Sequence, residues 1–227
     1  MKYTPLTPEL YDYLVKHGHH DDPILAELAE ETAAKLGPIS MMQIAPEQGT
    51  LLSILARVSG ARSAIEIGTF TGYSAISIAR GLPADGHLLC CDINEEWTAI
   101  ARRYWAKAGL TDKITLRLGP ALDTLGALPR DHRFDFAFID ADKTSYRAYY
   151  EALLPRLRPN GLILFDNVLW MGQVIDATNK GEDTVALRAL NDHIARDRRV
   201  QAVMIAVSDG ITVVRKRADD ELGGRVP

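Results

Sequence analysis

Acidic side chains follow strongly apolar segments of this 227-residue sequence. The segment FDFAFIDADK is apolar until Asp140, Asp142 and Lys143, and the segment GLILFDN ends in Asp166 and Asn167. Such apolar runs are typical of strands buried on both faces, where a terminal charge is costly unless it is paired or used. Carboxylate and amide oxygens are hard donors, so Asp140, Asp166 and Asn167 could converge on Mg²⁺, Mn²⁺ or Ca²⁺.

A divalent cation at this position would suit a substrate with two adjacent hydroxyls. Three protein oxygens leave about three octahedral positions free, and a vicinal diol could take two of them. The cation would also make a phenol hydroxyl more acidic, and Lys143 could accept the proton if the metal and partial burial favour its neutral amine. The alternative for Lys143 is a solvated lysine at a helix start, although a cation is unfavourable there.

The segment IEIGTFTGYS forms a second group of candidates. Gly68 and Gly72 flank Phe70, which stands at the middle glycine position of the GxGxxG pattern. A bulky residue there hinders the approach of a pyrophosphate to the backbone. The loop therefore favours a ligand other than a dinucleotide, and the alternative is a tight strand-to-helix turn that needs glycine for its geometry.

Two further acids lie at strand ends beside this loop. Glu66 ends SAIEIG, and Asp92 ends HLLCCDI, where it could accept hydrogen bonds from both hydroxyls of a ribose. The alternative for Asp92 is to cap the next helix, a role that Asn94 could fill instead. A ribose without a pyrophosphate, in an acidic pocket that suits a sulfonium cation, indicates S-adenosylmethionine as the cofactor.

The elements that would position these residues alternate between strand and helix from residue 61 onward. Strands are expected in SAIEIG, HLLCCDI, KITLRLG, FDFAFID and GLILFDN, and helices at about 73–80, 97–108 and 144–157, the last ending near Pro159. Successive β–α steps imply a parallel sheet with right-handed crossovers. Ligands bind beyond the carboxyl ends of such strands, where the candidate residues lie.

The two ends of the chain differ from this alternation. Up to about Gly60 the pattern is helical, with helices expected at 24–36 and 46–55. Near the other end, a helix at 183–196 precedes two strands joined by a tight turn at Asp209-Gly210. The fold class is therefore α/β: a class I methyltransferase Rossmann-like fold with helices on both faces, a mostly parallel sheet and an antiparallel terminal hairpin. Residues 1–227 are taken as one domain, with 218–227 as a disordered tail.

Composition excludes several classes of function. The formal net charge of -4 provides no broad basic field, which disfavours nucleic acid as a partner. The chain shows no signal peptide and no apolar window long enough to span a membrane, so we expect a cytoplasmic protein. Cys90 and Cys91 are expected in a buried strand rather than in a disulfide. The histidines of KHGHHDD (His17, His19 and His20) are expected in a loop rather than at a metal.

From about Met42 to the terminal hairpin, the sequence resembles the cation-dependent O-methyltransferases, the caffeoyl-coenzyme A and catechol O-methyltransferase group with its bacterial members. The resemblance rests on IEIGTFTGYSAISIA, DINEEW, KAGLTDKI, GPALDTL, FIDADKTSY and GLILFDNVLWMG. It implies a seven-stranded sheet, S-adenosylmethionine, a bound divalent cation and a homodimer. It also implies that residues 1–45 contribute to the substrate site or to the dimer.

The resemblance also assigns roles by position. Asp140, Asp166 and Asn167 match the metal ligands, and Lys143 matches the general base. Asp92 would bind the ribose and Ala121 would lie by the adenine. The full set of cofactor contacts implied in this way is Met42, Ile44, Glu66, Gly68, Thr69, Ser74, Asp92, Ile93, Ala121 and Asp140.

The substrate residues implied are Lys143, Asn167, Trp170 and Met171. Two positions depart from the pattern of the family. Ile44 offers only backbone atoms where a hydroxyl contact is usual, and Met171 replaces an asparagine that contacts substrate in the plant enzymes. These departures disfavour a coenzyme A ester and favour a smaller phenolic substrate. Trp170 is expected to form a wall of the substrate pocket, with core packing as the alternative.

The sequence thus predicts an S-adenosylmethionine- and Mg²⁺-dependent O-methyltransferase that methylates one hydroxyl of a vicinal dihydroxy aromatic molecule. A non-catalytic S-adenosylmethionine-binding protein that retains the fold is the main alternative. A nicotinamide-dependent oxidoreductase is disfavoured by Phe70 in the glycine loop and by the terminal hairpin.

Overall fold

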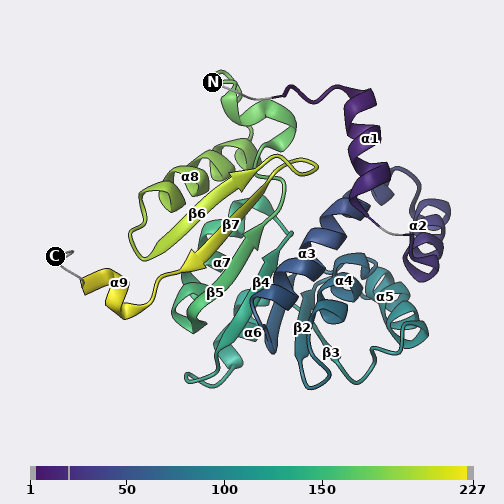
Figure 1. The fold of residues 1–227 in the computed structure, drawn as a ribbon, viewed down its shortest axis with the longest axis horizontal. Helices are drawn as coiled ribbons and strands as arrows, with labels where there is room; N and C mark the ends of the chain where they lie inside the picture. Colours follow the sequence, from purple (N-terminus) through teal and green to yellow (C-terminus); the bar gives the residue numbers. More distant parts are fainter. Residues whose placement is uncertain (1–3, 20, 224–227) are drawn as a thin grey trace.

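The computed structural model describes residues 4–19 and 21–223, and its centre is a seven-stranded sheet in the order β3-β2-β1-β4-β5-β7-β6 (Figure 1). The strands are β1 (Ser63–Ile67), β2 (His87–Asp92), β3 (Ile114–Leu118), β4 (Phe134–Ile139), β5 (Leu157–Phe165), β6 (Val200–Ile205) and β7 (Ile211–Lys216). The first five are parallel, and β7 pairs antiparallel with both β5 and β6. This topology confirms the predicted fold class and the terminal hairpin.

Helices cover both faces of the sheet. They are α1 (Pro8–Gly18), α2 (Pro23–Leu36), α3 (Pro46–Val58), α4 (Tyr73–Gly81), α5 (Glu95–Lys107), α6 (Ala121–Ala127), α7 (Tyr146–Leu153), α8 (Glu182–Arg196) and α9 (Asp219–Gly223), with short 3₁₀ turns at Gly37–Met42, Lys143–Ser145, Leu154–Arg156 and Trp170–Ile175. Residues of α2 to α5 form one core cluster and residues of α6 to α8 form the other. None of the described helices has the length and apolar character needed to cross a membrane.

The alternation of side chains along the central strands divides the core. On β4, Phe136 and Phe138 belong to the cluster beneath α3 and α4, whereas Ala137 and Ile139 belong to the cluster beneath α7. Both sets are fully buried. A strand covered on both faces has no place for a charge until it reaches the sheet edge, so the acids follow at its carboxyl end.

Helix caps explain where several helices begin. Asp22 accepts hydrogen bonds from the backbone N–H groups of Ile24 and Leu25, and Pro23 fits the first turn of α2. Asn94 accepts a hydrogen bond from Trp97 N and caps α5. The helix expected at 97–108 is confirmed, with a start two residues earlier.

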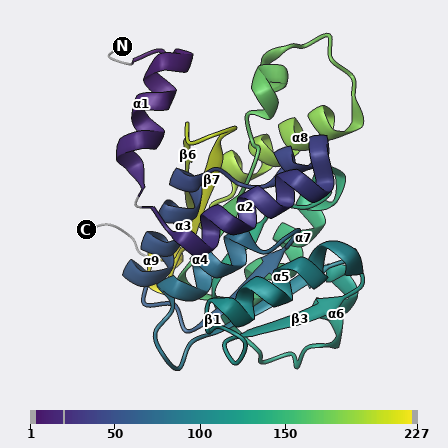
Figure 2. The same ribbon diagram turned by 90° about the vertical axis from the view of Figure 1, so that its right-hand side faces the viewer.

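The two N-terminal helices, α1 and α2, differ in how they pack against the rest of the protein. Helix α2 packs against α4 and α5, whereas α1 buries no residue and contacts α3 (Figure 2). His17 lies within α1, so the expectation of a loop is wrong there. Nδ1 of His17 bonds Tyr13 O, and Nδ1 of His19 bonds Val15 O. His20 lies outside the described residues.

Two other boundaries differ from expectation. The region expected as one helix at 144–157 is α7 with a 3₁₀ turn on each side, and β5 begins at Leu157. Pro159 therefore lies inside β5, between Leu157 and Leu162, where the pairing with β4 shifts register and a proline is tolerated. The short helix α6 was not expected.

The C-terminal segment is more ordered than expected. Residues 219–223 form α9, and Glu221 pairs with Arg215 at 2.6 Å and with Arg217 at 3.7 Å. The expected disordered tail is therefore wrong for this part, and residues 224–227 lie outside the described residues. Cys90 and Cys91 are free thiols buried in β2, as predicted.

Candidate active site

A cleft of about 960 Å³ opens at the carboxyl ends of β1, β2, β4 and β5. Every candidate residue except Glu66 lines it. These residues are Met42, Ile44, Gly68, Thr69, Ser74, Asp92, Ile93, Ala121, Asp140, Lys143, Asp166, Asn167, Trp170 and Met171. A second depression, of about 630 Å³ beside the end of α8, contains none of them.

The glycine loop between β1 and α4 forms one wall of the cleft. Gly68 has φ +89°, and a Cβ there would lie 1.8 Å from the backbone oxygen of Asp140. Gly72 has φ +92°, and its Cβ would lie 2.7 Å from the Cβ of Ala101 on α5. Both glycines are therefore required for the turn and for its contacts with β4 and α5.

Asp92 at the end of β2 holds this loop. Its Oδ2 accepts hydrogen bonds from the backbone N–H groups of Thr69 and Phe70, both at 2.8 Å, and its Oδ1 accepts one from Asn94 N at 2.8 Å. Because Asn94 caps α5, the capping alternative for Asp92 is wrong. A carboxylate has about four acceptor positions, so Asp92 retains capacity for a hydroxyl from the cleft.

Glu66 lies beneath the cleft rather than in its wall. Its side chain is fully buried, and its Oε1 has no hydrogen-bond partner among the described residues. Oε2 accepts a weak hydrogen bond from the Cys90 thiol at 3.4 Å. Burial raises the pKa of Glu66 to about 8, although the nearby polar side chains of Ser74, Cys90 and Thr69 oppose the shift. A buried carboxylate with an unpartnered oxygen suits a cationic ligand.

Asp140 and Asp166 lie side by side because β4 and β5 are neighbours in register. Ile139 pairs with Phe165, and Asp166 N donates to Ile139 O at 3.0 Å. Burial and the nearby charge of Asp140 raise the pKa of Asp166 to about 8. Asn167 follows with φ 54°, a conformation that asparagine tolerates better than most residues. Two repelling carboxylates and an amide oxygen are a donor set that fits a hard divalent cation.

Gln48 is a residue of this site that the sequence did not indicate. It is buried in the first turn of α3, and its Nε2 donates to Asp166 Oδ1 at 2.5 Å. Its Oε1 accepts from Ala45 N at 3.2 Å. Asp166 Oδ1 also accepts from Asn167 N at 2.7 Å. These bonds fix the Asp166 carboxylate and leave its Oδ2 available.

Lys143 is 7% exposed, so its interpretation as a solvated lysine is wrong. Its Nζ donates to Asp140 Oδ1 at 2.9 Å and to the Tyr146 hydroxyl oxygen at 2.7 Å. Tyr146 OH in turn donates to the backbone oxygen of Asp166 at 3.2 Å. The amine of Lys143 is thus held between the ends of β4 and β5, the strands that Asp140 and Asp166 follow. Asp142, by contrast, accepts a hydrogen bond from Tyr149 OH at 2.7 Å.

The turn after β5 forms the opposite wall. Trp170 lines the cleft and also packs against the core, so both readings of this residue hold in part. Met171 is 70% exposed, and its backbone N–H donates to Asp209 Oδ1 at 2.6 Å. Asp209, at the tip of the β6–β7 hairpin, therefore reaches the cleft, a role that the hairpin signal alone did not indicate.

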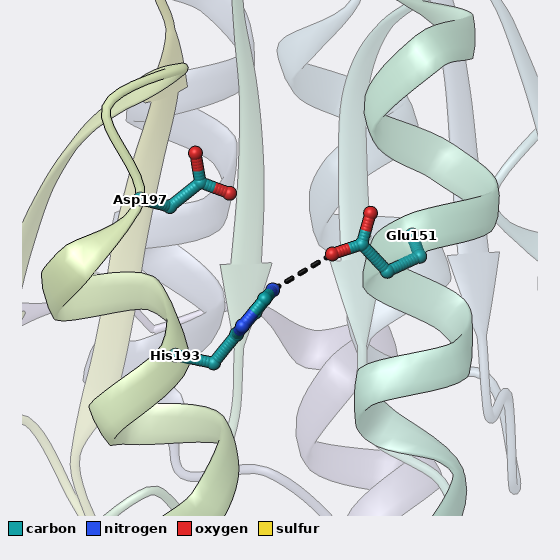
Figure 3. A group of neighbouring side chains, drawn as sticks. All are labelled: Glu151, His193 and Asp197. Carbon is teal, nitrogen blue, oxygen red and sulfur yellow. Dashed lines mark hydrogen bonds and ion pairs between the residues drawn. The ribbon is translucent and has the colours of Figure 1, made fainter.

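A second group of possible metal ligands is already paired with an arginine. Glu151, His193 and Asp197 place ligand atoms within 4.8 Å of one another, and His193 Nε2 lies 2.7 Å from Glu151 Oε1 (Figure 3). Arg199, however, bonds both carboxylates, at 3.0 Å to Glu151 Oε1 and 2.6 Å to Asp197 Oδ2. Although partial burial opposes it, hydrogen bonds from Arg199 and Tyr150 lower the pKa of Asp197 to about 2. The guanidinium already supplies the positive charge.

Comparison with known proteins identifies the family. A family model described as O-methyltransferase matches residues 15–217. The chain belongs to the O-methyltransferase family. A probable caffeoyl-CoA O-methyltransferase 1 from Dictyostelium discoideum is 39% identical over 211 residues, 91% of each protein. Catechol O-methyltransferase domain-containing protein 1 from Mus musculus is 38% identical over 93% of this chain and 82% of that protein.

Solved structures of bacterial proteins agree with this assignment. An O-methyltransferase from Bacillus cereus in complex with SAH has a TM-score of 0.84 and 34% identity, covering 92% of this chain and 97% of that one. The O-methyltransferase TomG from Streptomyces achromogenes, in complex with SAM, has a TM-score of 0.84 and 29% identity, covering 92% and 96%. The predicted resemblance to the caffeoyl-coenzyme A and catechol group, and the prediction of an O-methyltransferase, are therefore confirmed.

Replacing Glu66 by Gln tests the charge state of the buried carboxyl. Because the folded pKa of about 8 exceeds the ordinary value of 4.5, the folded chain keeps a proton that the unfolded chain loses. Stability therefore falls as pH rises from about 4.5 to about 8. We expect the free energy of unfolding of Glu66→Gln, relative to the parent protein, to increase with pH across this window, by at most about 1.4 kcal/mol per pH unit.

Urea unfolding of the ligand-free protein at about pH 5.5, 7 and 8.5 measures this difference. Glu30→Gln, at an exposed position of α2, is the matched control. A difference between Glu66→Gln and the parent protein that stays constant with pH would contradict the buried, neutral carboxyl.

Proposed function

We propose that the chain is an S-adenosylmethionine-dependent and divalent-metal-dependent O-methyltransferase that methylates one hydroxyl of a catechol-type small molecule. The observation that carries the proposal is the adjacency of Asp140 and Asp166 at the ends of β4 and β5, beside a buried lysine and inside one large cleft. Two acids and a lysine are expensive to bury, and action on a ligand would account for that cost.

The methyl donor is proposed to occupy the half of the cleft beside the glycine loop. Asp92 would bind the ribose hydroxyls, and Ala121 at the start of α6 would contact the adenine. The unpartnered Oε1 of Glu66 would favour the positive end of the donor. The solved relatives that carry SAH and SAM support this assignment.

Asp140, Asp166 and Asn167 would hold the divalent cation, with Gln48 fixing the orientation of Asp166. When bound, such a cation would supply orientation of the two substrate hydroxyls and would make one of them more acidic. Mg²⁺ is the proposed ion, and Mn²⁺ or Ca²⁺ offer the same type of coordination by oxygen.

Lys143 would accept the hydroxyl proton. Its amine is already held by Asp140 and Tyr146, so its position is fixed before substrate arrives. A dication on Asp140 would compete with the ammonium group for that carboxylate and would thereby favour the neutral amine. The resulting phenolate oxygen attacks the methyl carbon, the carbon–sulfur bond breaks, and its electron pair remains on sulfur. Alignment of the two substrates in the cleft would supply much of the acceleration.

A non-catalytic protein that binds S-adenosylmethionine remains the second candidate. Burial of Lys143 against Asp140, rather than at the surface, favours the enzyme. Assembly as a homodimer and a cytoplasmic location stay predictions.

Metal removal gives the first test. With S-adenosylmethionine and a simple catechol, we expect turnover with Mg²⁺ and at least about a hundredfold loss after chelation with EDTA, because alignment and acidification of the diol are both lost. Addition of excess Mg²⁺ should restore the rate. Equal rates with EDTA and with Mg²⁺ would contradict the metal requirement, and binding of the donor without turnover of any catechol would favour the non-catalytic candidate.

Lys143→Met tests the proposed base, because methionine retains most of the buried volume. We expect kcat to fall by about 10²- to 10⁴-fold, the range typical of a lost general base, with less than about a threefold change in donor affinity. Lys107→Met, at an exposed lysine that pairs with Glu27, is the control. An unchanged kcat at Lys143→Met would remove the assignment.

A further inference from the structure

The charged residues that line the cleft are almost all acidic. They comprise six aspartates and one lysine, Lys143, with no arginine or histidine among the described residues of the lining. That lysine already forms an ion pair with Asp140 at 2.9 Å. A substrate that carries negative charge would therefore meet no free cationic side chain in this lining.

Four of the six aspartates have a role in the fold or in the proposed metal site. Asp92 holds the glycine loop, Asp142 accepts a hydrogen bond from Tyr149, and Asp140 and Asp166 are the proposed metal ligands, whose charge a dication would offset. The remaining two, Asp183 and Asp209, have no cationic partner among the described residues that line the cleft.

Asp183 and Asp209 both lie next to the turn at Trp170–Ile175. This turn forms the side of the cleft where the methyl acceptor is proposed to bind. Asp209 binds the backbone N–H of Met171 through Oδ1, and its backbone oxygen accepts from Leu169 N at 3.0 Å. Asp183 lies in the first turn of α8, which packs against the same turn. The hairpin tip and the segment that leads into α8 lie at the same end of the sheet (Figure 1).

Their surroundings strengthen the effect of these charges. Both side chains are half-buried, so water screens them less than it screens fully exposed carboxylates. The second carboxylate oxygen of Asp209 forms no hydrogen bond among the described residues and is therefore available to a cation.

We propose that Asp183 and Asp209 determine which catechols the acceptor side of the cleft binds. Their charges favour catechols with an ammonium group or no charge over catechols with a carboxylate or phosphate group. This inference rests on the proposed function. It excludes coenzyme A thioesters as preferred acceptors, because their phosphate groups would meet two carboxylates and no free lysine or arginine in the lining. It therefore separates this chain from relatives that are named caffeoyl-CoA O-methyltransferases.

The test compares kcat/KM for catechols of similar size and different charge: dopamine, 4-methylcatechol and 3,4-dihydroxyphenylacetate, with caffeoyl-coenzyme A as the fourth acceptor. We expect dopamine to be the best and the two anionic acceptors the poorest. Asp209→Asn keeps the bond to Met171 N, and Asp183→Asn keeps the size of the side chain. Each should lower the ratio of dopamine to 3,4-dihydroxyphenylacetate by about fivefold, as expected for a partly exposed ion pair.

Asp192→Asn is the matched control, since Asp192 is on α8, is exposed and pairs with Arg196. It removes the same formal charge at a distance from the cleft and should leave the ratio unchanged. Raising the salt concentration should lower the ratio of kcat/KM for dopamine to that for 3,4-dihydroxyphenylacetate in the parent protein. It should have little effect in the variant that combines Asp183→Asn and Asp209→Asn.

Equilibrium binding of the same catechols to the protein with Mg²⁺ and SAH measures the selection without turnover. A preserved binding ratio with no methylation of any acceptor would contradict the proposed function and support the charge selection. Equal affinities for dopamine and 3,4-dihydroxyphenylacetate, a ratio that Asp183→Asn and Asp209→Asn leave unchanged, or preference for caffeoyl-coenzyme A would overturn the inference.

Discussion

Strands β4 and β5 end in adjacent carboxylates, and the repulsion between Asp140 and Asp166 is the constraint on which the site depends. The register of the two strands forces this proximity, because Ile139 pairs with Phe165 and each acid is the next residue. The core on both faces of the sheet prevents either side chain from turning away into the apolar interior. The protein must therefore supply positive charge at this edge, or leave one carboxyl neutral.

The neighbouring groups respond to that repulsion in two ways. Lys143 supplies a buried positive charge to Asp140, and Gln48 supplies a hydrogen-bond donor to Asp166. Neither compensates both acids, since the pKa of Asp166 stays raised to about 8 by burial and by Asp140. A divalent cation would satisfy both carboxylates at once, so the same repulsion that costs stability in its absence favours its binding.

The strand ends could be predicted from the sequence because an apolar run followed by an acid is a local signal. Asp140, Asp166 and Asn167 were found in this way, and the parallel sheet that aligns them followed from the β–α alternation. Gln48 and Asp209 were not found, because only tertiary packing brings the start of α3 and the tip of the β6–β7 hairpin to the cleft. The burial of Lys143 could not be decided from the sequence, since its Nζ lies 5.8 Å from the ring centroid of Trp170, which the turn after β5 brings to it.

The position of a bound ion is the most direct test of this account. Crystals grown with Mn²⁺ and SAH would locate the ion by its anomalous scattering. We predict one strong peak with oxygen ligands from Asp140, Asp166 and Asn167, at about 2.1–2.2 Å, and loss of that peak in Asp166→Asn. A peak at Glu151, His193 and Asp197, or no peak at the ends of β4 and β5, would contradict it.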